Sequence, residues 1–118
     1  MILVVAGTRT FTNRELLREK LTTYTMKAEV EWLHVGSREG ADRLALEWAY
    51  THSIDMKIHH ADWDTYKKAA GPIRNREMLE EAGPNAVVVC FWNGTSPGTK
   101  DLINQARKRK LRMKIIRY

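Results

Sequence analysis

Short apolar runs alternate along this chain with longer segments of helical periodicity, and this alternation limits its fold more than any other feature. The runs at residues 2–6 and 86–92 carry no charge and end directly before a glycine or a polar residue. Such runs are typical of strands in a parallel sheet, because a sheet that is covered on both faces has no polar side. Strands that alternate with helices favour connected β-α-β units. The sequence therefore predicts an α/β fold, with a mainly parallel sheet and helices on both faces.

The same pattern divides all 118 residues into elements. Strands are expected at residues 2–6, 31–35, 56–59, 86–92 and 113–116, the last at an edge of the sheet. Helices are expected from residue 12, over 41–52, over 73–82, and from the 93–99 loop to about residue 110. The first helix is expected to begin at a capping box with Thr12 as its N-cap. A chain of this length forms about one domain, so we expect a single domain over residues 1–118.

Three large or reactive side chains are expected inside this domain. Trp32 and Trp48 are interpreted as core residues, and Cys90 as a buried strand thiol. A single cysteine excludes an internal disulfide, which fits a reducing cytoplasm. The apolar run at residues 2–6 is too short for a membrane helix and lacks the basic residues of a signal peptide. We therefore expect a cytoplasmic protein with no membrane partner.

The charge of the chain is unevenly distributed. The chain contains 20 Lys and Arg residues and 14 Asp and Glu residues, which gives a formal net charge of +6. The segment 107–117 holds seven basic side chains and no acid, so it supplies the whole surplus. A basic segment of this kind favours nucleic acid or a phosphorylated small molecule as partner. It is equally well explained as a solvated tail that aids solubility.

Residues 70–78 contain the strongest single indication of a binding site. They place Arg74 and Arg76 at the start of the predicted 73–82 helix, behind a Gly71-Pro72 turn. The first turn of a helix has N–H groups without intrahelical acceptors and a partial positive charge. An added guanidinium therefore suits a phosphate or a carboxylate at this place.

Other loops are expected at the same edge of the sheet. In an open parallel sheet the loops that leave the strand ends share one edge, and ligands bind where the strand order reverses. Small side chains, hydroxyls and backbone N–H groups in these loops suit a phosphate. A glycine at such a turn more often only permits the turn, so the coincidence of several loops carries the prediction. The loop residues predicted to bind ligand are Gly7, Thr8, Arg9, Gly36, Ser37, Arg38, Gly40, Thr95, Ser96, Gly98 and Thr99.

Aromatic and acidic side chains near these loops have two interpretations each. Trp63, with Tyr66 and Trp92, is placed to stack on a base, but a large side chain that only closes the 61–66 excursion is as plausible. Asp42 suits a ribose hydroxyl or, equally, the dipole of the helix that it begins. Asp62 is either a ligand contact or a simple helix cap.

Several other kinds of site find no support in the sequence. Neither glycine-rich loop matches the dinucleotide or Walker pattern, and no serine-hydrolase elbow is present. The four histidines lack a carboxylate or thiol at ligand spacing, so no metal is expected. No cofactor is expected either. The histidines are His34, His52, His59 and His60.

Taken in chain order, these segments resemble the YspA and cpYpsA-related branch of the SLOG superfamily. The resemblance covers nearly the whole chain and rests on residues 7–9, 40–42, 61–63, 70–75 and 98–99. It implies a single SLOG-like domain, Rossmann-like and three-layered, with a sheet of about five strands. It also implies binding of nucleotides or molecules derived from them, and a homodimer.

The resemblance extends more distantly to the Lonely Guy phosphoribohydrolases, which cut the N-glycosidic bond of nucleoside monophosphates. Arg74 fits their arginine-lysine motif, although Asn75 replaces the lysine, and Gly98-Thr99 fits their glycine-rich loop. Leu102 stands in the place of their glutamate. An oxocarbenium-like transition state needs a carboxylate, so Asp42 and Asp101 become the candidate catalytic residues.

Three functions follow as hypotheses. The leading one is a crevice that binds a nucleotide or a nucleotide-derived signal or metabolite, with Arg74 and Asn75 added to the ligand-binding residues. Arg76, two positions from Arg74, cannot share its helical face and is expected to face solvent. The alternatives are an N-glycosidase or phosphoribohydrolase, and a nucleic-acid-binding protein that uses the basic segment, as the relation of the superfamily to the DNA-processing protein DprA implies.

Overall fold

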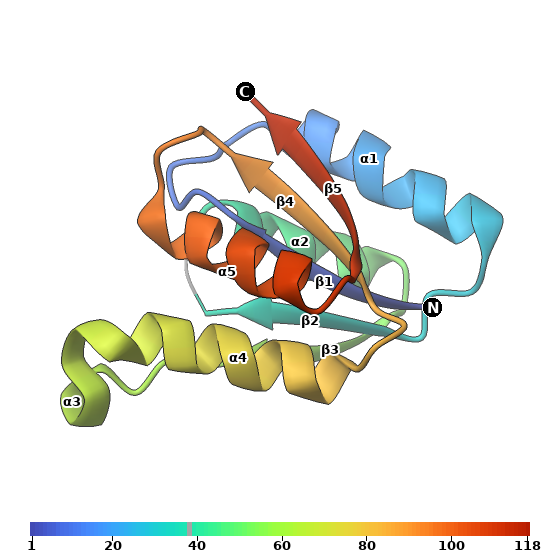
Figure 1. The fold of residues 1–118 in the computed structure, drawn as a ribbon. Helices are drawn as coiled ribbons and strands as arrows, with labels where there is room; N and C mark the ends of the chain where they lie inside the picture. Colours follow the sequence, from blue (N-terminus) through green and yellow to red (C-terminus); the bar gives the residue numbers. More distant parts are fainter. Residues whose placement is uncertain (38) are drawn as a thin grey trace.

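A computed structural model describes residues 1–37 and 39–118 of the chain. The fold is a five-stranded, wholly parallel sheet in the order β3-β2-β1-β4-β5 (Figure 1). The strands are β1 (Ile2–Gly7), β2 (Trp32–Gly36), β3 (Asp55–His59), β4 (Val87–Trp92) and β5 (Arg112–Arg117). The predicted α/β class is confirmed, and β5 is an edge strand as expected.

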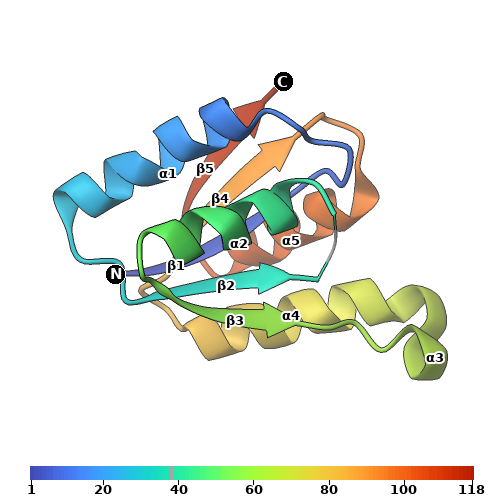
Figure 2. The same ribbon diagram turned by 180° about the vertical axis from the view of Figure 1, so that it is seen from behind.

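Helices cover both faces of the sheet, which gives three layers (Figures 1 and 2). The helices are α1 (Arg14–Lys27), α2 (Ala41–Thr51), α3 (Trp63–Tyr66), α4 (Ala70–Ala82) and α5 (Pro97–Lys108), with a short 3-10 turn at Lys67–Ala69. Helices α1 and α2 lie on one face, and α4 and α5 on the other. No helix in the described part of the chain is long and apolar enough to cross a membrane.

The sheet separates two apolar cores. Leu3 and Val5 of the central strand β1 face α1 and α2, while Val4 between them faces α4 and α5. All three are fully buried, because neighbouring residues of a strand point to opposite faces and both faces are covered. Uninterrupted apolar strands therefore fit this architecture.

The strand order reverses beside β1, which pairs with β2 on one side and β4 on the other. The connections that leave these strands diverge to opposite faces at this point, so a crevice opens at the carboxyl edge between them. Helices α2, α4 and α5 all begin at that edge (Figure 1). The topology thus brings three helix N-termini to one place.

Two helix starts differ from the sequence prediction. Asn13, not Thr12, is the N-cap of α1, and its Oδ1 accepts a hydrogen bond from the Leu16 N–H at 3.0 Å. Helix α4 begins at Ala70, so Gly71 and Pro72 lie within its first turn rather than in a turn before it. Proline is tolerated there because N–H groups of the first turn have no intrahelical acceptor.

The prediction that Trp32 is a core residue is wrong. Its exposed fraction is 41%, whereas Trp48 is 2% exposed. Trp32 is the first residue of β2 and so lies at the amino edge of the sheet. His34, two residues further along the same face, is the side chain that becomes buried there.

Cys90 confirms the expectation of a buried strand thiol. It is fully buried in the core beneath α4 and α5. Burial, and to a smaller extent the nearby Asp42 charge, raises the pKa of Cys90 to about 12. The thiol is therefore protonated at neutral pH and is not a nucleophile.

Candidate functional site

A cavity of about 450 Å³ opens at the carboxyl edge of the sheet, where the strand order reverses. This volume lies within the range of small-molecule sites. We call it the crevice. Its lining comprises Ala6, Gly7, Thr8, Arg9, Thr10, Gly36, Asp42, Trp63, Gly71, Arg74, Asn75, Met78, Asn93, Ser96, Pro97, Gly98 and Thr99.

The first turns of three helices contribute to this lining. Asp42 lies in the first turn of α2, Gly71 in that of α4, and Gly98 and Thr99 in that of α5. Pro97, the first residue of α5, has no N–H of its own. The N–H groups of Gly98 and Thr99 have no intrahelical acceptor, and the helix dipole adds a partial positive charge. Anionic groups are therefore favoured at this wall.

Arg74 and Asp42 meet at Gly36, the last residue of β2. A Cβ atom built on Gly36 would lie 2.6 Å from Nη1 of Arg74 and 2.8 Å from Oδ2 of Asp42. The two charged groups thus occupy the space that a side chain would need at this position. Groups of opposite charge this near to one another are mutually stabilised when partly buried. Gly36 leaves room for both, and a side chain at this position would have to displace the end of one of them.

Hydrogen bonds to Asn75 and to His59 hold the guanidinium of Arg74. Its Nε donates to Oδ1 of Asn75 at 3.0 Å, and its Nη1 donates to the carbonyl oxygen of His59 at 3.5 Å. The Asn75 amide also donates to the Gly98 carbonyl at 3.2 Å and to Oδ2 of Asp101 at 3.0 Å. Asn75 is 3% exposed, and its amide connects Arg74 with the first turn of α5.

The loops after β1 and β4 are joined by the Thr8 side chain. The Thr8 N–H donates to the Phe91 carbonyl at 2.9 Å, and Oγ1 of Thr8 accepts from the Asn93 N–H at 3.1 Å. Oδ1 of Asn93 in turn accepts from the N–H groups of Thr95 and Ser96, each at 2.9 Å. The wall that leads into α5 is therefore built from internal hydrogen bonds, which keep it in position without a ligand.

Arg9 and Trp63 lie at the rim of the crevice. Arg9 is exposed, and the Trp63 indole is 44% exposed. The Cη2 atom of Trp63 lies 3.4 Å from the position that a Cβ of Gly71 would take, so the indole covers the first turn of α4. A charged ligand would thus meet a cation and an aromatic face at the entrance.

Residues 1–66 of the chain match the YspA, cpYpsA-related SLOG family, which is more than half of its length. The chain belongs to this family. The predicted resemblance is therefore confirmed. The SLOG protein is also similar to the gene 61 protein of Mycobacterium phage D29, with 30% identity over 111 residues, 89% of this chain and 87% of the phage protein. No solved structure matches the SLOG protein.

Most residues that the sequence predicted for the site line the crevice of the SLOG protein. The predicted residues in the lining are Gly7, Thr8, Arg9, Gly36, Asp42, Trp63, Arg74, Asn75, Ser96, Gly98 and Thr99. Arg38 lies outside the described residues. Arg76, which was expected to face solvent, is exposed.

Four predicted ligand-binding residues are not among the described residues that line the crevice: Ser37, Gly40, Asp62 and Thr95. Gly40 has a φ of +79°, and a Cβ there would press on the backbone of Thr8 and Arg9, so this glycine serves the packing of two loops. Asp62 is the N-cap of α3 and accepts from the Thr65 N–H at 3.2 Å. Thr95 donates its hydroxyl to Asn93. These contacts give Gly40, Asp62 and Thr95 structural roles.

The two candidate catalytic carboxylates occupy different places. Asp42 is 5% exposed and lines the crevice, whereas Asp101 is outside the described lining. Oδ2 of Asp101 accepts from the amides of Asn75 and Gln105, the latter at 2.8 Å. Leu102 is fully buried in the core beneath α5. Asp42 is therefore the carboxylate available to crevice chemistry.

Six lining residues were not predicted: Ala6, Thr10, Gly71, Met78, Asn93 and Pro97. Asn93 had a usable signal, because it directly follows β4 at the carboxyl edge and precedes a glycine. Gly71 and Pro72 were assigned to a turn, so the place of Gly71 inside α4 was missed. The Met78 side chain is buried where α4 meets the sheet, and its helical periodicity indicates only core.

The remaining aromatic and basic candidates of the SLOG protein lie elsewhere. Tyr66 and Trp92 are not in the described lining, and the Trp92 indole N–H donates to the Ser96 carbonyl at 3.1 Å. The basic segment is divided between the end of α5 and both faces of β5, since Arg112 and Lys114 share one face and Arg117 lies on the other. The Arg117 guanidinium stacks over the Trp92 ring at 5.3 Å. Nucleic-acid binding by this segment stays a prediction.

Proposed function

We propose that this protein binds a nucleotide or a nucleotide-derived molecule, a signal or a metabolite, in the crevice. One observation carries the proposal: Arg74 and the first turns of α2, α4 and α5 converge on a single cavity at the reversal of strand order. Membership of the SLOG family supports a role related to nucleotides.

Each part of such a ligand has a matching wall. The phosphate lies against the first turn of α5, where Gly98 and Thr99 offer N–H groups, and within reach of Arg74. The ribose hydroxyls lie near Asp42, because a carboxylate accepts hydrogen bonds from vicinal hydroxyls. The base stacks on Trp63 at the rim. Arg9 and Arg74 outnumber Asp42 among the charged lining residues described, so the crevice favours an anion.

Isothermal titration tests this proposal with ADP-ribose, AMP and adenosine as probes. We expect a phosphorylated probe to bind and adenosine to bind more weakly, because adenosine lacks the group that Arg74 and α5 would hold. Arg74→Gln removes the charge and should weaken binding of the phosphorylated probe by about tenfold or more. Arg76→Gln is the matched control on the same helix and should leave the affinity unchanged, since Arg76 is exposed.

The aromatic contact has an equally close control. Trp63 and Tyr66 belong to the same short helix and have similar exposed fractions, 44% and 48%, but only Trp63 is in the described lining. Trp63→Ala should therefore weaken binding, and Tyr66→Ala should not. The proposal fails if no phosphorylated probe binds, or if Arg74→Gln and Arg76→Gln behave alike.

Hydrolysis of an N-glycosidic bond is the weaker alternative. The position of the Lonely Guy glutamate holds the buried Leu102, and Asp101 is bonded to two amides. Asp42 remains, but its place beside Arg74 at Gly36 suits the binding of a ribose. We therefore expect the titrated nucleotides to be recovered intact, with no free base detected by chromatography. If the wild-type protein releases free base and the Asp42→Asn variant does not, the N-glycosidase alternative is favoured instead.

A further inference from the structure

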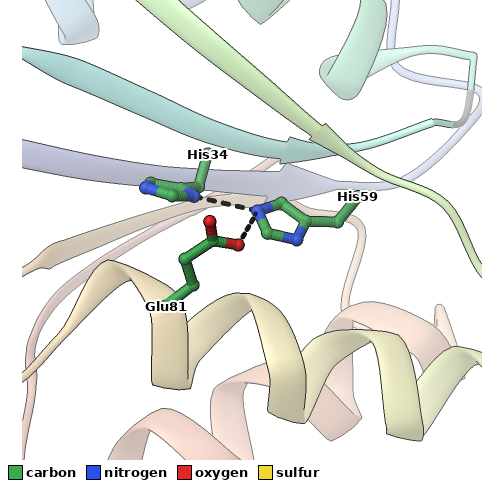
Figure 3. Close-up of side chains that lie close together, drawn as sticks. All are labelled: His34, His59 and Glu81. Carbon is green, nitrogen blue, oxygen red and sulfur yellow. Dashed lines mark hydrogen bonds and ion pairs between the residues drawn. The ribbon is translucent and has the colours of Figure 1, made fainter.

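Two histidines and a glutamate meet on the sheet face that α4 covers, outside the crevice lining. Oε2 of Glu81, in the last turn of α4, lies 3.6 Å from Nε2 of His59, and Nδ1 of His34 lies 2.9 Å from the same nitrogen. His34 belongs to β2 and His59 ends β3 (Figure 3). One ligand atom from each residue lies within 4.8 Å of the other two. We call this set the histidine cluster.

From the histidine cluster we infer a site for a divalent transition metal of the zinc type. Around a tetrahedral Zn²⁺ ion, with bonds of about 2.0–2.1 Å, two ligand atoms lie about 3.3 Å apart. The separations of 2.9 Å and 3.6 Å in the histidine cluster lie on either side of this value. The ligand atoms of the third pair, His34 and Glu81, lie within 4.8 Å of one another, so the side chains must draw together to admit an ion. Two imidazoles with one carboxylate and an open fourth position form a known kind of zinc site.

The bonding of the two rings supports this inference. The close pair of ring nitrogens in His34 and His59 shares one proton as a hydrogen bond, with one nitrogen as donor and the other as acceptor. A metal ion that replaces this proton binds both lone pairs. The exposed fractions of His34 and His59 are 5% and 9%, so the rings are already held in place by packing. Little conformational entropy is lost when they bind an ion.

Lys57 holds the carboxylate in an orientation suited to a metal. Its Nζ donates to Oε1 of Glu81 at 2.9 Å, which leaves Oε2 directed at His59. Ligating carboxylates are commonly held by such a second hydrogen bond. The side chain of Glu81 is 45% exposed, so the ion has an entry path and water can occupy the fourth position. Nitrogen ligands select zinc-type ions over Mg²⁺ and Ca²⁺, which prefer oxygen.

Calorimetric titration of ZnCl₂ into the full chain, after treatment with EDTA and dialysis, tests the site. We expect one equivalent to bind, while MgCl₂ gives no binding. CoCl₂ should give the strong visible absorption of a tetrahedral ion with nitrogen and oxygen ligands. This inference is independent of the proposed function, because none of the three ligands is in the described crevice lining.

Four variants locate the ion. His59→Gln and Glu81→Gln should each weaken zinc binding by at least about tenfold. His60→Gln and Glu80→Gln change the neighbouring exposed residues and should leave it unchanged. Glu81 is half exposed, so Glu81→Gln keeps the test decisive if His59→Gln fails to fold. The inference is overturned if the wild-type protein takes up no zinc. It is also overturned if zinc binds to the Glu81→Gln variant as tightly as to the Glu80→Gln variant.

Discussion

At the scale of single residues, Gly36 shows how a glycine leaves room for two charged side chains. It ends β2 at the floor of the crevice, and its missing side chain leaves the space that Arg74 and Asp42 fill. By contrast, a Cβ added to Gly98 would meet nothing within 4 Å. The two glycines both line the crevice, but only at Gly36 would an added side chain have to displace a neighbour.

Gly36→Ala is therefore expected to lower the free energy of unfolding by about 1–3 kcal/mol, because an added methyl group must displace Arg74 or Asp42. Gly98→Ala should leave it unchanged or raise it slightly, since alanine favours a helix over glycine by up to about 1 kcal/mol. Urea denaturation of both variants measures the difference. Equal stability of Gly36→Ala and the wild-type protein would contradict the steric argument.

Some residue roles were predictable from spacing and others were not. Arg74 and Arg76 are two positions apart on one helix, so the sequence already separated a lining residue from an exposed one. The structural roles of Gly40, Asp62 and Thr95 were not separable from ligand binding, because glycine, aspartate and threonine serve turns and caps with the same chemistry. That distinction needs the hydrogen-bond partners, which only the fold supplies.

At the scale of elements, one buried amide adds a polar connection to the apolar packing between α4 and α5. Asn75 on α4 donates to the Gly98 carbonyl and to Asp101, both on α5. These bonds fix the start of α5 relative to Arg74, so they determine the shape of the proposed phosphate wall. Asn75 thus has a structural role of its own.

Asn75→Ala should lower the free energy of unfolding by about 2–3 kcal/mol, because the three hydrogen bonds of this buried side chain, to Arg74, Gly98 and Asp101, are lost. Asn104→Ala changes an exposed asparagine on α5 and should cost less than about 0.5 kcal/mol. Denaturant titration gives both values. If the two variants are equally stable, the amide does not join the helices.

The elements themselves were largely predictable. The five strands and the helices after β1, β2 and β4 follow from apolar runs and helical periodicity, which local sequence encodes directly. The start of α4 was misplaced because Gly71 and Pro72 usually indicate a turn, whereas the first turn of a helix also accepts them. Trp32 was wrongly predicted to be a core residue, because the apolar pattern of a strand does not show which of its residues the neighbouring helices cover.

At the scale of the whole molecule, the histidine cluster makes stability depend on pH. Burial, and then the proximity of His34, lowers the pKa of His59 from its ordinary 6.5 to about 4. Burial also lowers the pKa of His34. Lys57 and Arg74 act in the same direction on His59, and Glu81 opposes them. Both rings are therefore neutral in the folded protein at neutral pH.

The unfolded chain binds protons on both rings near pH 6.5, where the folded chain does not. The free energy of unfolding should therefore be fully maintained above about pH 6.5 and fall as the pH drops towards about 4, by up to about 1.4 kcal/mol per pH unit for each proton. Urea denaturation in EDTA across this interval measures the slope.

His59→Gln removes one of the two titrations and should reduce this slope. His60→Gln, which changes the exposed neighbour of His59, should preserve it. A slope that is the same in all three proteins would show that the buried rings do not control the response. The histidine cluster was not predictable, because its members are far apart in sequence and meet only when β2, β3 and α4 pack.

The position of β1 also determines when the molecule can become complete during its synthesis. This first strand lies at the centre of the sheet. Leu3 of β1 pairs with Val87 of β4, so the β1–β4 ladder can form only after residue 87 has been synthesised. The core beneath α4 and α5 contains Leu102 and Leu111, which are made later still. A nascent chain that ends with α4 contains Arg74 but lacks α5 and the loop before it, which also line the crevice. Binding competence should therefore arise only after β4 and α5 have been synthesised and have packed against β1.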